Sequence, residues 1–150
     1  MVDETFVGAV SNEDNMLSMN FQVVGVKKAL AAVSKICKAG NIVQFGEAED
    51  ECFIMNKNTK KKIMLIKKKG SYTINVDFVK STGSGGFEKV GSETITIDSG
   101  AEESVCPLGW GESFGLQAVG KSGRMRMVNA AGDVMPHYGS RKVHFTESFF

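Results

Sequence analysis

The hydrophobic pattern of residues 42–79 has a period of two, and this restricts the fold more than any other feature of the chain. Apolar and polar side chains alternate most regularly over residues 71–79, as in a strand with one buried face. Apolar runs at residues 52–55 and 62–66 flank a turn-forming segment, so we expect them to pair as a hairpin. Seventeen glycines and two prolines in 150 residues agree with many tight turns. The sequence therefore predicts a mostly β fold.

One helix is predicted ahead of these strands, between short strands at residues 21–24 and 42–45. Its apolar residues recur at helical spacing, and lysines lie largely on the other side. Gly40 and Asn41 supply a left-handed stop. The apolar positions are Ala29, Leu30, Ala32, Val33, Ile36 and Cys37.

The second half of the chain begins after the segment that most resembles a linker, Ser81–Gly86. Strands are predicted at 93–97, 125–128 and 142–145, and residues 129–136 are rich in turn formers. The length fits one domain of ordinary size.

Charge and cysteine content exclude several classes of protein. Eighteen Lys and Arg against 17 Asp and Glu give a net charge of +1, which disfavours a strongly basic nucleic-acid binder. Cys37, Cys52 and Cys106 form no CxxC pair, and His137 and His144 match no metal-binding pattern, so we expect no disulfide framework, metal or cofactor. The chain shows no signal peptide and no apolar run long enough to span a membrane. We therefore expect a soluble cytoplasmic protein.

The strongest chemical signal is the run Asp98-Ser99-Gly100-Ala101 directly after the predicted strand at 93–97. An aspartic protease presents its catalytic carboxylate on such a strand-to-loop turn. There, two carboxylates share one proton and activate a water. We expect the hydroxyl beside the aspartate to support the loop, and the glycine to permit a turn where a Cβ would clash. By itself the tripeptide is also compatible with a plain turn.

The segment from Ile95 to Val105 resembles the active-site segment of retropepsins, and the closer likeness is to proteases of Copia-type retrotransposons. The likeness to this family covers about two-thirds of the chain, and it implies a retropepsin-like β-barrel half with one short helix. It also implies an aspartic endopeptidase that acts on the element's own polyprotein, inside the cell or within retrotransposon particles. Further segments that carry the likeness are Asn129–Gly132, Tyr138–Val143, Val26–Ser34, Lys38–Phe45, Asn56–Lys60 and Gly70–Ile74.

These segments occur in reversed order, which predicts a circular permutation. Residues 1–80 resemble the C-terminal half of the family, and residues 93–150 resemble its catalytic N-terminal half. Residues 81–92 would then join the old termini, which must lie close together for a permutation to be tolerated. The rearrangement could be engineered or natural.

The chain contains one Asp-Ser/Thr-Gly sequence, so the resemblance implies a homodimer with one Asp98 from each copy. Joining the family's terminal strands puts dimer formation in question. A catalytically inactive relative that serves dimerisation or peptide binding is the alternative. The resemblance also implies a glycine-tipped hairpin, or flap, over the substrate, and our candidate is the run Asn129, Ala130, Ala131, Gly132 and Asp133. An ordinary turn with Gly132 at positive φ is equally compatible with this run.

Two other patterns in the sequence, a Gly-x-Ser-x-Gly match and two lysine clusters, also have simpler explanations. Gly111–Gly115 matches Gly-x-Ser-x-Gly, but no strand precedes it, which argues against a serine hydrolase. Lys60–Lys62 and Lys67–Lys69 flank one apolar strand and could bind phosphates, although lysines at strand ends commonly form a solvated edge. Nucleic acid is therefore the less favoured partner at this point, and a peptide is the favoured one.

Overall fold

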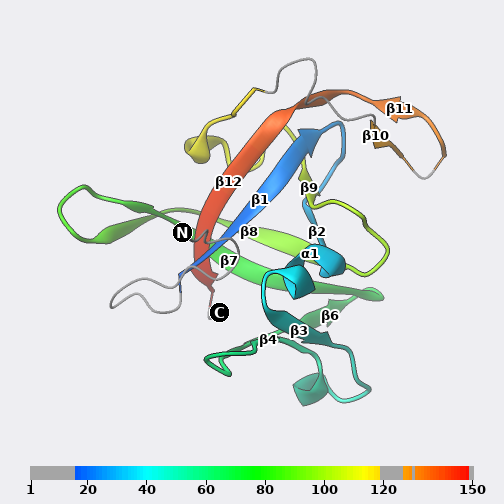
Figure 1. The fold of residues 1–150 in the computed structure, drawn as a ribbon, viewed down its shortest axis with the longest axis vertical. Coiled ribbons are helices and arrows are strands. Elements are labelled where there is room, and N and C mark those ends of the chain that lie inside the picture. Colours follow the sequence, from blue (N-terminus) through cyan, green and yellow to red (C-terminus); the bar gives the residue numbers. More distant parts are fainter. Residues whose placement is uncertain (1–15, 119–126, 130, 149–150) are drawn as a thin grey trace.

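The computed structural model describes residues 16–118, 127–129 and 131–148 (Figure 1). Within these ranges strands predominate, as the sequence predicts. The first half of the chain contains β1 (Leu17–Val24), β2 (Leu30–Ala32), α1 (Val33–Lys38), β3 (Asn41–Gln44), η1 (Glu49–Glu51), β4 (Phe53–Asn56), β5 (Lys62–Met64), β6 (Ile66–Lys68) and β7 (Ser71–Ser81). The second half contains β8 (Phe87–Asp98), β9 (Val105–Cys106), η2 (Glu112–Phe114), β10 (Met127–Val128), β11 (Val134–Met135) and β12 (His137–Glu147).

Six strands form a closed barrel in the order β12-β1-β9-β2-β8-β7, and β6 extends the sheet beyond β7. β12 closes the barrel because it pairs with β1 along one edge and with β7 along the other, so that Phe145 lies opposite both Leu17 and Phe78. Most pairs are antiparallel. The exceptions, β1 with β9 and β2 with β8, bring segments from distant parts of the sequence side by side.

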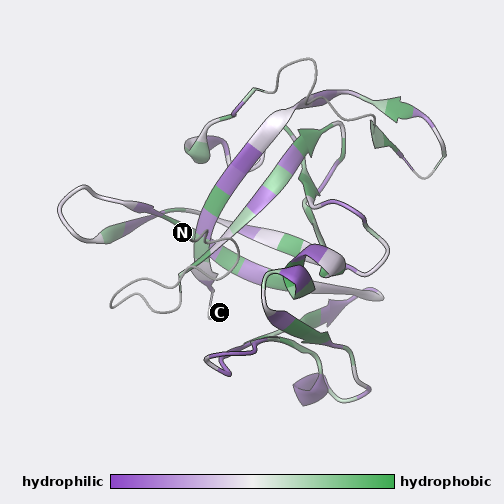
Figure 2. Cartoon of the chain, in the orientation of Figure 1, coloured by the Kyte–Doolittle hydropathy of each residue, from purple (hydrophilic) through white to green (hydrophobic). Residues whose placement is uncertain are grey.

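Alternation along the long strands explains why the barrel forms. Ile74, Val76 and Phe78 of β7 are buried, as the period of two predicts, and β12 buries Val143 and Phe145 in the same way. Figure 2 shows the corresponding change between hydrophilic and hydrophobic residues along β1 and β12. The buried side chains meet in one continuous hydrophobic core, which extends from the barrel to Ile36 of α1 and Ile54 of β4.

One end of the core is filled by Trp110, whose ring lies edge-on against Phe21 at 4.9 Å and Phe78 at 5.0 Å between centroids. Arg141 of β12 is also buried here, at 4% exposure. Burial raises the pKa of the Cys106 thiol to about 11, and the neighbouring Arg141 opposes the rise without cancelling it. A neutral, buried thiol packs as a small core residue.

The predicted helix is wrong over its first half. Residues 30–32 form β2, inserted between β8 and β9, and α1 begins only at Val33. Ala31 and Ala32 are fully buried in this slot, so tertiary pairing overrides the helical spacing of the sequence. The predicted stop is confirmed, since Gly40 has φ 99° and follows Ala39, the C-cap of α1.

A small three-stranded sheet, β3-β4-β5, lies beside the barrel and confirms the predicted hairpin between residues 52–55 and 62–66 (Figure 1). Its inner face presents Val43, Ile54 and Ile63 to the core. Only Leu65, which is buried, separates β5 from β6. The run from Lys62 to Lys68 therefore links the small sheet to the barrel.

β7 and β8 form one long hairpin, and the linker-like residues 82–86 are its turn. β8 begins at Phe87, six residues before the strand that the sequence predicts. The part of the hairpin next to the turn extends away from the barrel at the left of Figure 1. The segments before and after the turn are thus paired directly with each other.

Candidate functional site

Asp98 is the last residue of β8, a strand held between β7 and β2. It pairs with Ala32 in the parallel β2–β8 ladder, and the preceding Ile97 is buried. The Asp98 side chain is half-buried at the point where the strand leaves the sheet, while Ser99 and Gly100 are exposed. The barrel therefore fixes the backbone that carries this carboxylate, and the loop after it is open to a ligand.

The loop after Asp98 is a tight turn closed on the carboxylate itself. Gly100 N–H donates to Asp98 Oδ1 at 2.8 Å, which holds one oxygen of the carboxylate in place. Our expectation of a steric need for glycine is wrong within a single chain. A Cβ at residue 100 would meet Asp98 Oδ1 at an ordinary 3.5 Å, and the φ angle there is not positive.

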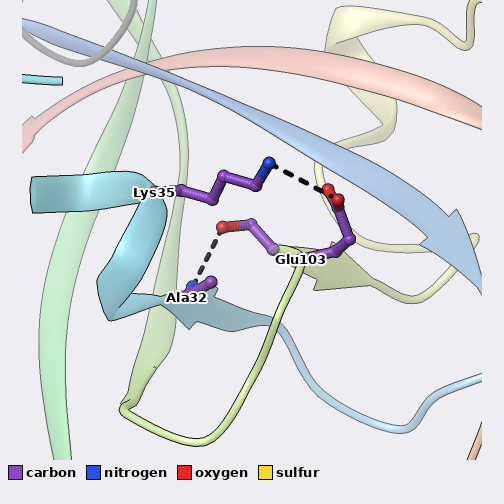
Figure 3. Close-up of polar contacts among 4 residues, drawn as sticks. Ala32, Lys35 and Glu103 are labelled. Atoms are coloured by element: carbon purple, nitrogen blue, oxygen red, sulfur yellow. Dashed lines mark hydrogen bonds and ion pairs between the residues drawn. The ribbon is translucent and has the colours of Figure 1, made fainter. Parts of the chain in front are cut away.

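Two contacts that the sequence did not suggest hold the end of this loop, residues 103 and 104, against the start of α1 (Figure 3). Ser104 is 3% exposed, and its Oγ accepts a hydrogen bond from Ala32 N–H at 3.0 Å. Glu103 Oε2 lies 3.4 Å from Lys35 Nζ on α1. Because Ala32 pairs with Asp98, the Ser104 contact ties both sides of the candidate site together. No sequence signal separates Ser104 from other serines, since its role depends on a residue 72 positions away.

Replacing Ser104 with alanine is expected to destabilise the protein by about 1–3 kcal/mol, because the buried Ala32 amide loses its acceptor. Urea unfolding measures this difference. Ser113→Ala is the matched control, since Ser113 is exposed outside this loop and its replacement should change stability by less than about 0.5 kcal/mol. Equal unfolding midpoints for the two variants would contradict the assigned role of Ser104.

The candidate flap is a hairpin within the described residues. β10 and β11 pair antiparallel, and Gly132 has φ 89°, as the turn prediction required. Asn129 organises the turn, because its Oδ1 accepts hydrogen bonds from Ala131 N–H and Asp133 N–H, both at 2.9 Å. Ala130 lies outside the described residues.

Asp98 lines two cavities. The larger, about 770 Å³, has the Asp98 loop on one side and the β10–β11 hairpin on the other, with Met127, Asn129 and Met135 among its lining residues. The second, about 480 Å³, lies between Asp98 and the aromatic pair Phe45 and Tyr72. The Asp-Ser-Gly turn and the candidate flap therefore face a common space.

A third cavity, about 470 Å³, lies between β1 and α1 and is lined by Ser18, Lys35 and Glu103 but not by Asp98. Ser18 Oγ is 2.8 Å from His144 Nδ1 in the neighbouring β12. Burial, and secondarily the charge of Lys142, lowers the pKa of His144 and so favours the neutral imidazole. Ser18 and His144 are therefore hydrogen-bonded to each other across the β1–β12 pair.

The other patterns of the sequence lie elsewhere. In Gly111–Gly115 the serine is in the short helix η2, and the residues directly before the motif, Pro107–Trp110, are not in a strand, as our argument against a serine hydrolase expected. One lysine cluster, Lys60–Lys62, leads into β5, and the other, Lys67–Lys69, lies at the end of β6. Among the described residues no three His, Cys, Asp or Glu side chains are gathered as a metal site would require. No helix in the described ranges is long and apolar enough to cross a membrane.

The fold and the site together define a closed β-barrel with an Asp-Ser-Gly turn at the end of a central strand. Compared with protein-family models, with curated proteins and with solved structures, the chain has no significant match in any of the three.

Proposed function

We propose that this protein is an aspartic endopeptidase of the retropepsin type that acts as a homodimer. The observation that carries the proposal is the cavity of about 770 Å³ between the Asp98 turn and the β10–β11 hairpin. It supplies, in one place, a carboxylate on a rigid strand and a hairpin that can cover a bound peptide. The likeness of residues 95–105 to the retropepsin active-site segment supports the same function.

The proposed chemistry needs two carboxylates at one water. Two Asp98 side chains, one from each copy, would share a proton, so that one carboxylate takes a proton from the water as it attacks the peptide carbonyl. Gly100 N–H would keep the inner oxygen of each carboxylate oriented, and Ser99 would support the turn. An extended peptide would lie between the turn and the hairpin as an added strand.

The second carboxylate is assigned to another copy because the neighbouring acids in the cavity are differently placed. Glu103 is engaged by Lys35, and neither Glu102 nor Glu103 lies in an Asp-Ser-Gly turn. A single copy therefore presents half of the proposed catalytic pair. In this scheme, activity depends on association of two copies through their Asp98 faces.

The test is cleavage of an unfolded protein substrate at mildly acidic pH, measured over a wide range of chain concentration. Below the dimer dissociation constant, the initial rate should rise with the square of the concentration, because two chains build one site. Light scattering on the same samples reports the oligomeric state. A chain that stays monomeric at high micromolar concentration and cleaves nothing would contradict the proposal and favour an inactive peptide-binding module.

A further inference from the structure

The net charge of +1 hides a strong separation of charge along the chain. Residues 52–76 contain seven lysines and no aspartate or glutamate, so this segment carries +7 and the remaining residues carry a net −6. All seven lysines are exposed. They are Lys57, Lys60, Lys61, Lys62, Lys67, Lys68 and Lys69. A local excess of this size is the electrostatic footprint of a surface for polyanions.

The fold arranges these lysines along one extended path. Lys62 opens β5, and Lys67 and Lys68 lie in β6, the terminal strand of the large sheet. At about 3.3 Å per residue, the chain from Lys62 to Lys67 spans at most about 17 Å, the length of about five phosphates of a stacked strand. The turn before β5, which is hydrophilic in Figure 2, carries the other cluster.

Ion pairs do not explain the position of the six lysines other than Lys61. Lys35 pairs with Glu103 and Lys89 pairs with Asp77, both outside this segment. The acidic turn of residues 47–51 precedes β4, whereas the lysine turn of residues 57–62 follows it. The two turns therefore lie at opposite ends of β4.

Aromatic rings accompany the lysines. Lys62 Nζ lies 4.2 Å from the centre of the Phe53 ring, and Lys67 Nζ lies 5.9 Å from that of Tyr72. Tyr72 in turn packs against Phe45 at 4.8 Å between ring centres. Phe45 is 39% exposed, so part of its ring is open beside the basic path. Cations along a path with an accessible ring beside it are the combination that binds single-stranded nucleic acid.

We propose that the surface formed by β5, β6 and the turns that flank them binds single-stranded nucleic acid. The lysines contact successive phosphates, and a base stacks on Phe45. An unpaired strand is the assigned ligand because a duplex keeps its bases stacked inside the helix, where the Phe45 ring cannot reach them. This activity is separate from the proposed cleavage, since Asp98 takes no part in it.

The experiment measures binding of a fluorescent oligouridine of about 20 nucleotides by anisotropy, between about 50 and 200 mM salt. In the basic-surface variant, Lys67→Gln, Lys68→Gln and Lys69→Asn are combined; asparagine suits residue 69, which has φ 52°. Each lost phosphate contact should reduce the slope of log affinity against log salt by about 0.7. The triple variant should therefore lose about 2 from the slope.

The matched control, Lys27→Gln with Lys38→Gln and Lys89→Gln, removes the same charge from exposed positions outside the surface and should keep the parental slope. Phe45→Ala should weaken binding about tenfold at every salt concentration with no change in slope.

Equal slopes for the two triple variants would overturn the proposal. So would binding to a duplex of the same length at least as tight as to the single strand. Affinity for vesicles of anionic lipid, with none for the oligonucleotide, would also overturn it and would assign the lysines to a membrane surface.

Discussion

An Asp98→Asn variant is expected to lose cleavage activity by at least about 10³-fold while keeping its fold. The asparagine side-chain oxygen can still accept the Gly100 N–H hydrogen bond, so the turn is retained. Its amide group, however, can neither hold the shared proton nor take one from a water. The loss therefore reports the chemistry of the carboxylate rather than the structure of the loop.

The measurement compares cleavage of an unfolded protein by the parent and by the variant under identical conditions. Asp50→Asn is the matched control, because Asp50 is exposed in the acidic turn and its substitution removes the same charge away from the cavity. Cleavage by Asp98→Asn at the parental rate would remove Asp98 from the proposed mechanism.

Mixing the parent with the variant adds a test of the two-copy site. If one carboxylate comes from each chain, mixed dimers are inactive, and an equal mixture keeps about a quarter of its dimers as parental pairs. Activity per parental chain should then fall by about half. An unchanged activity per parental chain would show that each copy acts alone.

Arg141→Met is expected to lower the free energy of unfolding by about 3–5 kcal/mol. Arg141 is buried and donates from Nε to Gly115 O at 2.6 Å and from Nη1 to Leu108 O at 3.0 Å and Trp110 O at 2.5 Å. The methionine leaves three carbonyl groups without this donor at the end of the barrel. Each hydrogen bond from a charged donor contributes about 1.5–3 kcal/mol, and the apolar packing of methionine offsets part of the loss.

Urea unfolding monitored by tryptophan fluorescence measures this free energy, because Trp110 is the chain's single tryptophan and lies beside the substitution. Lys38→Met removes an exposed positive charge and should change stability by less than about 0.5 kcal/mol. The stability of Arg141→Lys should lie between those of Arg141→Met and Lys38→Met, since one ammonium group cannot reach all three carbonyls. A midpoint for Arg141→Met equal to that of Lys38→Met would contradict the structural role.

The strands were predictable where one face is buried and the other wet, because that environment imprints alternation on the sequence, as in residues 71–79. The helix was predicted too long because Ala31 and Ala32 fit either a helix or a buried slot in a sheet. The pairing of β2 with β8 decides between them. Closure of the barrel was not predictable in this way, since it depends on pairing between residues as distant as Phe78 and Phe145.

The residues of the candidate site differ in the same way, because some depend on local motifs and others on distant partners. Asp98 and the turn at Gly132 were identified because short local motifs specify tight turns. Ser104, Lys35 and Arg141 were missed because their partners are supplied by other strands and loops. Net charge gives little information on the lysine clusters, because it sums over the whole chain, whereas the local charge of residues 52–76 is +7.

The pairing of β1 with β12 has a consequence for how this barrel can be carried within larger proteins. Leu17 at the start of β1 lies opposite Phe145 near the end of β12, so the described chain enters and leaves the barrel at neighbouring points. A domain with adjacent entry and exit can be inserted into a surface loop of a host protein without separating the two sides of that loop. The geometry of β1 and β12 would therefore allow this barrel to be inserted as a domain into a loop of another protein.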